Sequence, residues 1–148
     1  MARFIYAALI IGIISFYQSY FGLNIFGIKI NLALAGIIAA SFFLKDIPET
    51  IFLIALSSFA LKFSPQAEEG IIIFSSVLLG AVLIRKFLPW HNAINNVFLV
   101  FLSTLAFYLI GAYKLILSAV FLKEALLNIF AGILMFALFS FLWQINKK

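Results

Sequence analysis

The hydrophobic positions of the chain form long runs separated by short polar segments. A helix needs about 20 mostly apolar residues to cross a bilayer, and the charged residues divide the chain into pieces of roughly that size. The pattern predicts an all-α integral membrane protein: a compact bundle of six short transmembrane helices in one domain, residues 1–148. Five helices are the alternative, if the second and third form one broken hairpin. The six are expected at residues 4–21, 30–44, 47–63, 65–88, 93–113 and 123–145.

Turn and capping residues mark the expected helix ends. The segment 22–29 holds two glycines and an asparagine, which favour a turn. Asp46 and Glu49 have the spacing of a capping box, and S-P-Q-A-E-E (64–69) repeats the helix-start pattern before the fourth helix. Pro89 is expected to stop that helix. Residues 115–122 lie between two lysines and are too few to span, so they predict a short interfacial or re-entrant piece before the last helix.

The composition indicates whether water or lipid surrounds this protein. Hydrophobic residues make up 66% of the 148 residues and charged ones only 10%, whereas about a quarter of the residues of a soluble domain are charged. A water-soluble fold of this length could not bury so much apolar surface. Most of the chain must therefore contact lipid. The absence of cysteine excludes disulfides, thiolate nucleophiles and cysteine-based metal sites.

The charge distribution predicts the orientation. The net charge of +5 is typical of cytoplasmic loops beside anionic lipid, and we expect no nucleic-acid partner. The N-terminus resembles a signal peptide but lacks a small-x-small cleavage site, which indicates an uncleaved first helix. With six spans, both termini share a side with more basic residues and should face the cytoplasm, in a multi-pass membrane protein. That side holds Arg3, Lys45, Arg85, Lys86, Lys147 and Lys148, against Lys29, Lys62, Lys114 and Lys123 on the other.

No acidic or basic residue lies near the middle of a predicted span. Ionisable residues inside a membrane usually mark ion or proton pathways, so their absence argues against a pump, a proton-coupled transporter or a charged-substrate channel. A membrane enzyme also finds no support, because there is no nucleophile–base pair, metal cluster or phosphate-binding glycine loop. We expect no catalytic residues, no cofactor and no metal.

The densest polar cluster is R-K-F-L-P-W-H-N-A-I-N-N (85–96), which contains the only histidine. Nothing near His91 completes a catalytic or metal-binding set, so it is interpreted as an interfacial residue. Trp90 and Trp143 are expected at the membrane–water interface. The segment predicts a cytoplasmic turn that contacts anionic lipid or an acidic patch of a partner, with Asn92 or Asn95 capping the next helix. Its candidate contact residues are Arg85, Lys86, Trp90, His91 and Asn92.

Small and hydroxyl residues indicate how the helices pack. Small residues four apart let helix backbones approach closely. Serine and threonine pairs lie mid-span at 57–58, 75–76 and 103–104, where they join helices or line a ligand cavity. Asn128 and Gln18 each need a hydrogen-bond partner in hydrocarbon, and for Asn128 that partner lies inside this bundle or on another protein. The small-residue pairs are Ala8/Gly12, Ala35/Ala39, Gly36/Ala40 and Ser76/Gly80.

Three fragments resemble the MreD family of rod-shape-determining proteins: I-K-I-N-L-A-L (28–34), L-L-G-A-V-L-I-R-K-F-L-P-W-H-N (78–92) and L-L-N-I-F-A-G-I-L-M-F-A-L-F (126–139). The resemblance implies a non-enzymatic scaffold subunit in the bacterial inner membrane, part of the cell-elongation (cell shape and peptidoglycan synthesis) machinery. Its expected partners are the lipid bilayer, an MreC-like protein and cell-wall synthase subunits, and no small-molecule ligand is expected. The residues expected to pack helices or contact partners are Ala8, Gly12, Asn31, Gly36, Ala40, Ser76, Gly80 and Asn128.

The fold of that family is similar to that of the substrate-binding subunits of energy-coupling-factor vitamin transporters. This similarity supplies the alternative function, in which Ala8 and Gly12 dock a coupling subunit. A vitamin pocket would need polar and aromatic side chains converging near the outer face. The candidates for its lining are Tyr17, Gln18, Tyr20, Asn24, Gln66 and Tyr113.

Overall fold

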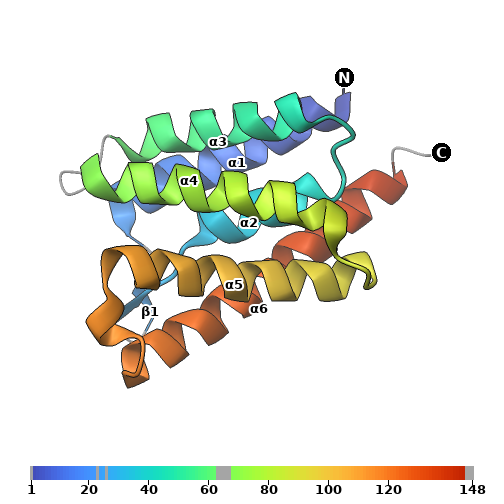
Figure 1. Cartoon of the computed structure of the whole chain (residues 1–148). Coiled ribbons are helices and arrows are strands. Elements are labelled where there is room, and N and C mark those ends of the chain that lie inside the picture. Colours follow the sequence, from blue (N-terminus) through green and yellow to red (C-terminus); the bar gives the residue numbers. More distant parts are fainter. Residues whose placement is uncertain (1, 23, 26, 63–67, 146–148) are drawn as a thin grey trace.

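The computed structural model describes residues 2–22, 24–25, 27–62 and 68–145, and this part of the chain consists of helices, short connections and one short hairpin (Figure 1). The prediction of a helical bundle is confirmed. In chain order the elements are α1 (Ala2–Phe21), β1 (Asn24–Ile25), β2 (Ile28–Lys29), α2 (Leu32–Ser41), α3 (Ile47–Leu61), α4 (Glu68–Ile84), the 3₁₀ turn η1 (Arg85–Phe87), α5 (Asn92–Gly111), the 3₁₀ turn η2 (Tyr113–Leu115) and α6 (Ala119–Ile145).

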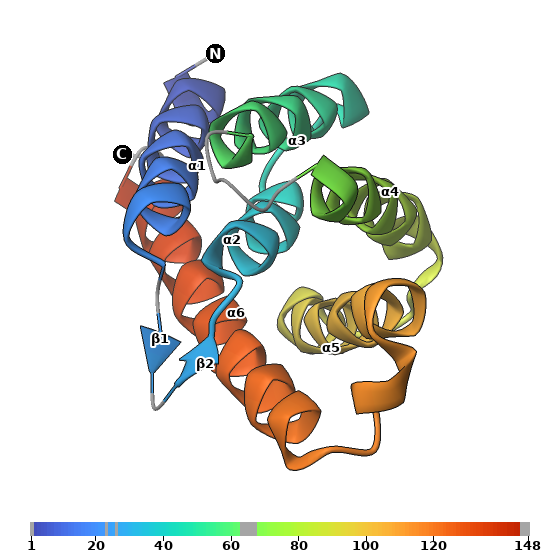
Figure 2. The same cartoon turned by 90° about the vertical axis from the view of Figure 1, so that its left-hand side faces the viewer.

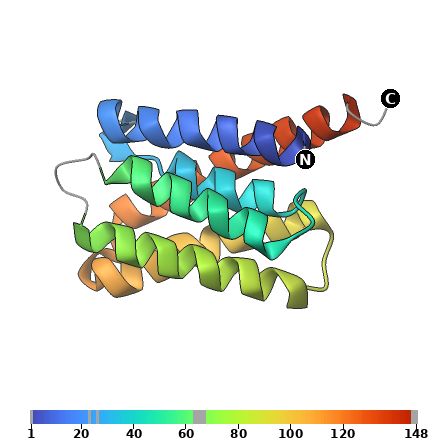
Figure 3. The same ribbon diagram turned by 90° about the horizontal axis from the view of Figure 1, so that it is seen from above.

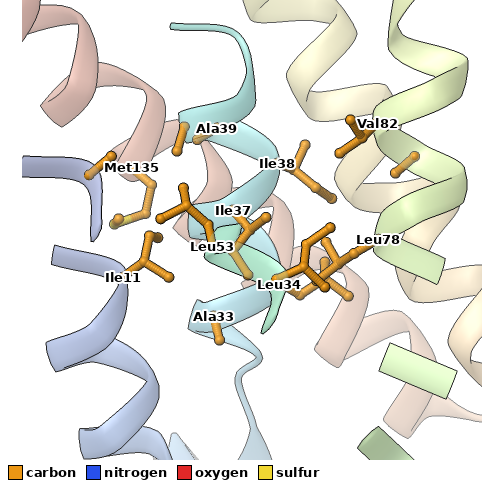
Figure 4. Packing of buried hydrophobic residues seen from close by; sticks show 14 of the residues in the cluster. Ile11, Ala33, Leu34, Ile37, Ile38, Ala39, Leu53, Leu78, Val82 and Met135 are labelled. Atoms are coloured by element: carbon orange, nitrogen blue, oxygen red, sulfur yellow. The ribbon is translucent and has the colours of Figure 1, made fainter. Parts of the chain in front are cut away.

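The shortest helix, α2, lies at the centre of the bundle, with the other five arranged around it (Figure 2). Every residue from Ala33 to Ser41 is buried, because neighbours cover all faces of α2. Its side chains belong to one hydrophobic core that also takes residues from the five other helices, and Figure 4 shows part of this core. Each of these helices contributes at least one buried residue, for example Ile11, Leu53, Leu78, Leu99 and Met135.

Four helices, α1, α4, α5 and α6, are long and apolar enough to cross a membrane. By contrast, α2 has 10 residues and α3 has 15, which correspond to about 15 Å and about 22 Å of helix at a rise of 1.5 Å per residue. Both are shorter than the ~20 residues that a span normally requires. Length therefore supports four of the six predicted spans, and a crossing by α2 or α3 stays a prediction.

The chain alternates between two ends of the bundle (Figures 1 and 3). The termini end holds the start of α1, the α2–α3 connection and the α4–α5 connection. The opposite hairpin end holds β1, β2 and the α5–α6 connection. The termini end thus holds four basic residues that the sequence analysis placed on one side, namely Arg3, Lys45, Arg85 and Lys86. The side of the bilayer that this end occupies stays a prediction.

Glycine determines the shape of the connection after α1. Gly22 has φ +54° and Gly27 has φ +77°, values in the left-handed region that side chains with a Cβ disfavour. Gly22 ends α1, and its amide donates to the carbonyl of Gln18 at 3.2 Å. The expected turn at 22–29 is present as an antiparallel hairpin in which Asn24 pairs with Lys29 and Ile25 with Ile28.

Two predicted caps are wrong in detail. Helix α3 does begin after Asp46, but the exposed Asp46 side chain makes no capping hydrogen bond. Helix α5 is capped by His91, whose Nδ1 accepts from the amide of Ala93 at 3.3 Å, and neither Asn92 nor Asn95 takes this role. The predicted cap at 64–65 lies outside the described residues.

The last helix begins earlier than predicted. The Ser118 hydroxyl accepts from the amide of Phe121 at 3.3 Å, and the Ser118 carbonyl accepts from the amide of Leu122. Because these bonds start the helix, α6 runs from Ala119 rather than from 123. Residues 115–122 are therefore not a separate piece, since they comprise the end of η2, a turn at 116–118 and the first turn of α6.

Candidate functional site

Four polar side chains, Gln18, Asn31, Thr104 and Asn128, form an amide network at the start of α2. Asn128 Oδ1 accepts from the backbone amide of Asn31 at 2.8 Å, and Asn128 Nδ2 donates to Thr104 Oγ1 at 3.2 Å. Gln18 Nε2 donates to Asn31 Oδ1 at 3.2 Å, while Gln18 Oε1 accepts from the amide of Ala33 at 2.9 Å. The network joins α1, α2, α5 and α6, so the partners of Asn128 and Gln18 lie inside the bundle.

Asn31 is also the N-cap of α2. Its Oδ1 accepts from the amide of Leu34 at 3.1 Å. The backbone N–H groups at the start of a helix have no partner within the helix and need an acceptor. Because α2 begins inside the bundle, water does not reach these N–H groups. The side chains of Asn31, Gln18 and Asn128 accept their hydrogen bonds instead. The candidate packing residues Asn31 and Asn128 thus act on the same helix terminus.

The contact between α5 and α6 depends on two residues that the sequence analysis missed. Asn96 Nδ2 donates to the Gly132 carbonyl at 3.0 Å, and both residues are buried. A Cβ at Gly132 would lie 2.9 Å from Val100 Cγ2, too close for the two helices to keep their separation. The signals available in the sequence were Asn96, the last residue of the polar segment at the start of α5, and Gly132, the only glycine of α6.

Hydroxyl groups join helices at two further places, which confirms the packing interpretation there. Ser15 Oγ and Ser57 Oγ are 2.6 Å apart and link α1 to α3. Ser58 Oγ and Ser75 Oγ are 2.8 Å apart and link α3 to α4.

The small residues fall into two groups. A Cβ at Gly36 would lie 2.8 Å from Ile11 Cδ1, so this glycine lets α1 and α2 approach closely, and Ala35, Ala39 and Ala40 are buried around it. Gly12 is looser, since a Cβ there would lie 3.6 Å from Leu56 Cδ2, and Ala8 beside it is half-buried. Gly80 has open space where a Cβ would stand, so its pair with Ser76 makes no close helix contact within the bundle.

Ser76 and Gly80 instead line a groove between α4 and α5, with a volume of about 230 Å³. Ser103 also lines it and is only 2% exposed. Neither serine hydroxyl hydrogen-bonds to any residue that the structure describes. The groove is otherwise apolar, and its remaining lining residues are Val77, Ala81, Ile84, Leu102, Ala106 and Ile110.

The predicted cytoplasmic turn is a compact structure at the termini end. Asn95 Nδ2 donates to the carbonyl of Trp90 at 2.7 Å, which closes the turn. The Trp90 ring packs against Phe98 with ring centroids 5.5 Å apart and remains half exposed. Arg85 is half-buried, with its guanidinium carbon 5.7 Å from the centroid of the Phe42 ring.

Lys86, His91 and Asn92 are exposed, so they remain available for outside contacts. Trp143 differs from the prediction. It is only 5% exposed, and its Nε1 donates to the Phe43 carbonyl at 3.1 Å. It is therefore a core residue at the termini end, because its indole N–H finds an acceptor inside the bundle.

The described candidates for a vitamin pocket do not converge. Gln18 and Tyr20 line one open pocket at the hairpin end, but Gln18 uses its amide in the network. Tyr17 and Tyr113 are exposed and line other surfaces. The side chain of Asn24 and the whole of Gln66 lie outside the described residues.

Among the residues that the structure describes, no group of three His, Asp or Glu side chains could hold a metal ion. Comparison of the chain with family models, with curated proteins and with solved structures gives no match. The class of protein is defined by the fold alone. Its long apolar helices indicate a helical membrane protein in contact with a lipid bilayer.

Proposed function

We propose that the protein is a non-enzymatic scaffold subunit of the bacterial inner membrane, which binds transmembrane helices of partner proteins in the cell-elongation machinery. The observation that carries this proposal is the groove between α4 and α5. It is open toward the surroundings of the bundle, and it combines small residues with two hydroxyl groups that hydrogen-bond to none of the described residues.

Such a groove suits a helix better than a lipid chain. Helices associate in membranes through small residues that permit close packing and through polar side chains that hydrogen-bond across the contact. A hydroxyl in hydrocarbon gains from a hydrogen-bond partner, and an acyl chain offers none. A partner helix with a serine, threonine or amide side chain would fill the groove and bond to Ser76 or Ser103.

The identity of the machinery rests on the sequence fragments that resemble the MreD family. One of them, residues 78–92, begins inside the groove-lining part of α4 and ends in the exposed turn at His91 and Asn92. A membrane helix of an MreC-like partner would therefore contact the groove and the turn together. Cell-wall synthase subunits are the further partners that the resemblance implies.

A groove-filling double variant tests the binding of partner helices. In Gly80→Leu/Ala106→Leu, both leucines occupy the groove while the bundle retains its own contacts, since Gly80 has open space beside it. Co-purification of a co-expressed MreC-like protein in mild detergent should fall about tenfold, because overpacking a helix contact costs ~1–3 kcal/mol. The matched control is Ala137→Leu, at an exposed small residue of α6, and should co-purify normally.

Depletion of the protein in its own host tests the cellular role. Rod-shaped cells should become wide or round as the protein is lost. Unchanged cell shape, together with recovery of only a transporter ATPase and its coupling subunit, would overturn the scaffold proposal in favour of a vitamin-binding transporter subunit.

A further inference from the structure

A polar pocket lies at the termini end of the bundle. It shares no lining residue with the groove between α4 and α5. Three separate segments build it: the first turn of α1, the α2–α3 connection and the first turn of α3. They enclose a pocket of about 380 Å³. Four of its lining residues carry formal charge, namely Arg3, Lys45, Asp46 and Glu49, and we call it the charged pocket.

The four charged side chains of the charged pocket are not paired with one another. Arg3, Lys45, Asp46 and Glu49 form no ion pair and no side-chain hydrogen bond with any residue that the structure describes. The guanidinium carbon of Arg3 lies 6.0 Å from the centroid of the Trp143 ring, a contact that leaves its N–H donors free. Two cationic donors and two carboxylate acceptors are thus available to a ligand.

The position of the pocket indicates the source of the ligand. It lies where α1 begins and α2 and α3 meet, at an end of helices that span or approach the bilayer (Figure 3). Phe4, Phe43 and Leu44 form the rest of its lining. A polar wall beside an apolar wall at a helix end matches a phospholipid, whose charged headgroup adjoins its acyl chains.

We propose that the charged pocket binds a phospholipid headgroup that carries both a phosphate and a primary ammonium, as in phosphatidylethanolamine. Arg3 and Lys45 donate to the phosphate oxygens, and Asp46 and Glu49 accept from the ammonium. Hydrogen bonds between charged groups are about twice as strong as neutral ones. The trimethylammonium of phosphatidylcholine has no N–H to donate, and phosphatidylglycerol has no cation for the carboxylates.

The relative affinities of three phospholipids for the unmodified protein test the proposal. Phosphatidylethanolamine, phosphatidylcholine and phosphatidylglycerol with identical acyl chains are titrated against the full chain in detergent, and lipid-bound species are counted by native mass spectrometry. Phosphatidylethanolamine should bind about tenfold more tightly than either of the others, since charge-assisted hydrogen bonds are lost in both. Equal binding of the three lipids would overturn the proposal.

Two double variants then test which side chains bind the ammonium and which bind the phosphate of the headgroup. Asp46→Asn/Glu49→Gln should lower phosphatidylethanolamine binding to the level of phosphatidylcholine and raise phosphatidylglycerol binding. Arg3→Gln/Lys45→Gln should weaken all three lipids. The control Lys114→Gln, at an exposed lysine of the hairpin end, should leave the ranking unchanged, and a loss of ranking in the control would overturn the assignment to this pocket.

Soluble phosphoethanolamine distinguishes a lipid from a free zwitterion. It should compete only at concentrations far above those of the lipid, because it makes no contact with Phe4, Phe43 or Leu44. Displacement of the lipid at equal concentration would overturn the lipid as the ligand. The charged pocket and the groove share no lining residue, so the failure of this proposal and the failure of the scaffold proposal are separate outcomes.

Discussion

The two faces of α5 carry similar residues and differ in what covers them. On the face toward α6, Thr104 Oγ1 accepts from Asn128 Nδ2, and Asn96 Nδ2 donates to the Gly132 carbonyl, so these two residues hydrogen-bond to α6. The face toward α4 carries Ser103, the neighbour of Thr104 in the chain, whose hydroxyl faces an open groove. Adjacent hydroxyl residues thus have different surroundings: Thr104 accepts a hydrogen bond from α6, and Ser103 lines the groove.

The difference teaches that small and hydroxyl residues in a membrane helix do not by themselves identify a binding surface. Gly132 and Gly80 illustrate this. Gly132 is required because α5 lies directly against it, whereas Gly80 borders open space. If the groove is a partner site, substitutions on the α6 side should change stability, and substitutions on the α4 side should change binding.

The largest effect on stability is expected from Asn128→Leu. It leaves the backbone amide of Asn31 without its acceptor and removes the donor to Thr104. Leaving a buried group unpaired costs ~1–3 kcal/mol, so the free energy of unfolding should fall by about 2–3 kcal/mol. Titration with SDS in mixed micelles measures it, with Leu126→Ala at an exposed position of α6 as the control. A loss no larger than that of the control would refute the structural role of the network.

Two glycine substitutions, one on each side of α5, should differ in their effect on the free energy of unfolding, and this effect is smaller than that of Asn128→Leu. Gly132→Ala should lower the free energy of unfolding by about 1–2 kcal/mol, because its Cβ meets the stiff, β-branched Val100. Gly80→Ala should leave stability unchanged or raise it by up to ~1 kcal/mol, through the higher helix propensity of alanine. The same SDS titration applies, and equal losses in the two variants would contradict the difference between the faces.

The smallest effects concern the neighbouring hydroxyls. Thr104→Val keeps the shape of the side chain but removes the acceptor for Asn128, and should cost about 1 kcal/mol. Ser103→Ala should change stability by less than ~0.5 kcal/mol, since its hydroxyl has no partner among the described residues. Its effect should appear instead in the co-purification of an MreC-like partner. A stability loss for Ser103→Ala as large as that for Thr104→Val would argue that both hydroxyls serve internal packing.

Much of the fold was predictable from the run lengths of apolar residues. The positions of α1, α4, α5 and α6 follow from four long runs, and Pro89 does end the α4 segment, with Leu88 in an extended conformation before it. The turn at 22–29 was predictable because glycine allows positive φ. Helix α2 was predicted too long, since its first residues are set by the cap at Asn31 and by contacts from Asn128, which is remote in the chain.

The candidate sites were less predictable, because they depend on pairs of residues far apart in the sequence. Asn128 was recognised as a residue in need of a partner, but its bond to the Asn31 amide spans 97 positions. The charged pocket was not foreseen, because Asp46 and Glu49 have the spacing of a helix cap. Only the structure places them in one pocket with Arg3 and Lys45.

The sequence by itself determined that this protein resides in lipid, that it folds as helices, and which connections share an end of the bundle. These properties depend on apolar content, on run length and on local turn chemistry, all of which act between residues close in the chain. The tertiary structure alone decided that α2 is central, that the α6 face of α5 is closed and that the α4 face is open. A hydrogen bond needs two groups within about 3 Å of each other, and only the arrangement of the helices brings distant groups to that distance.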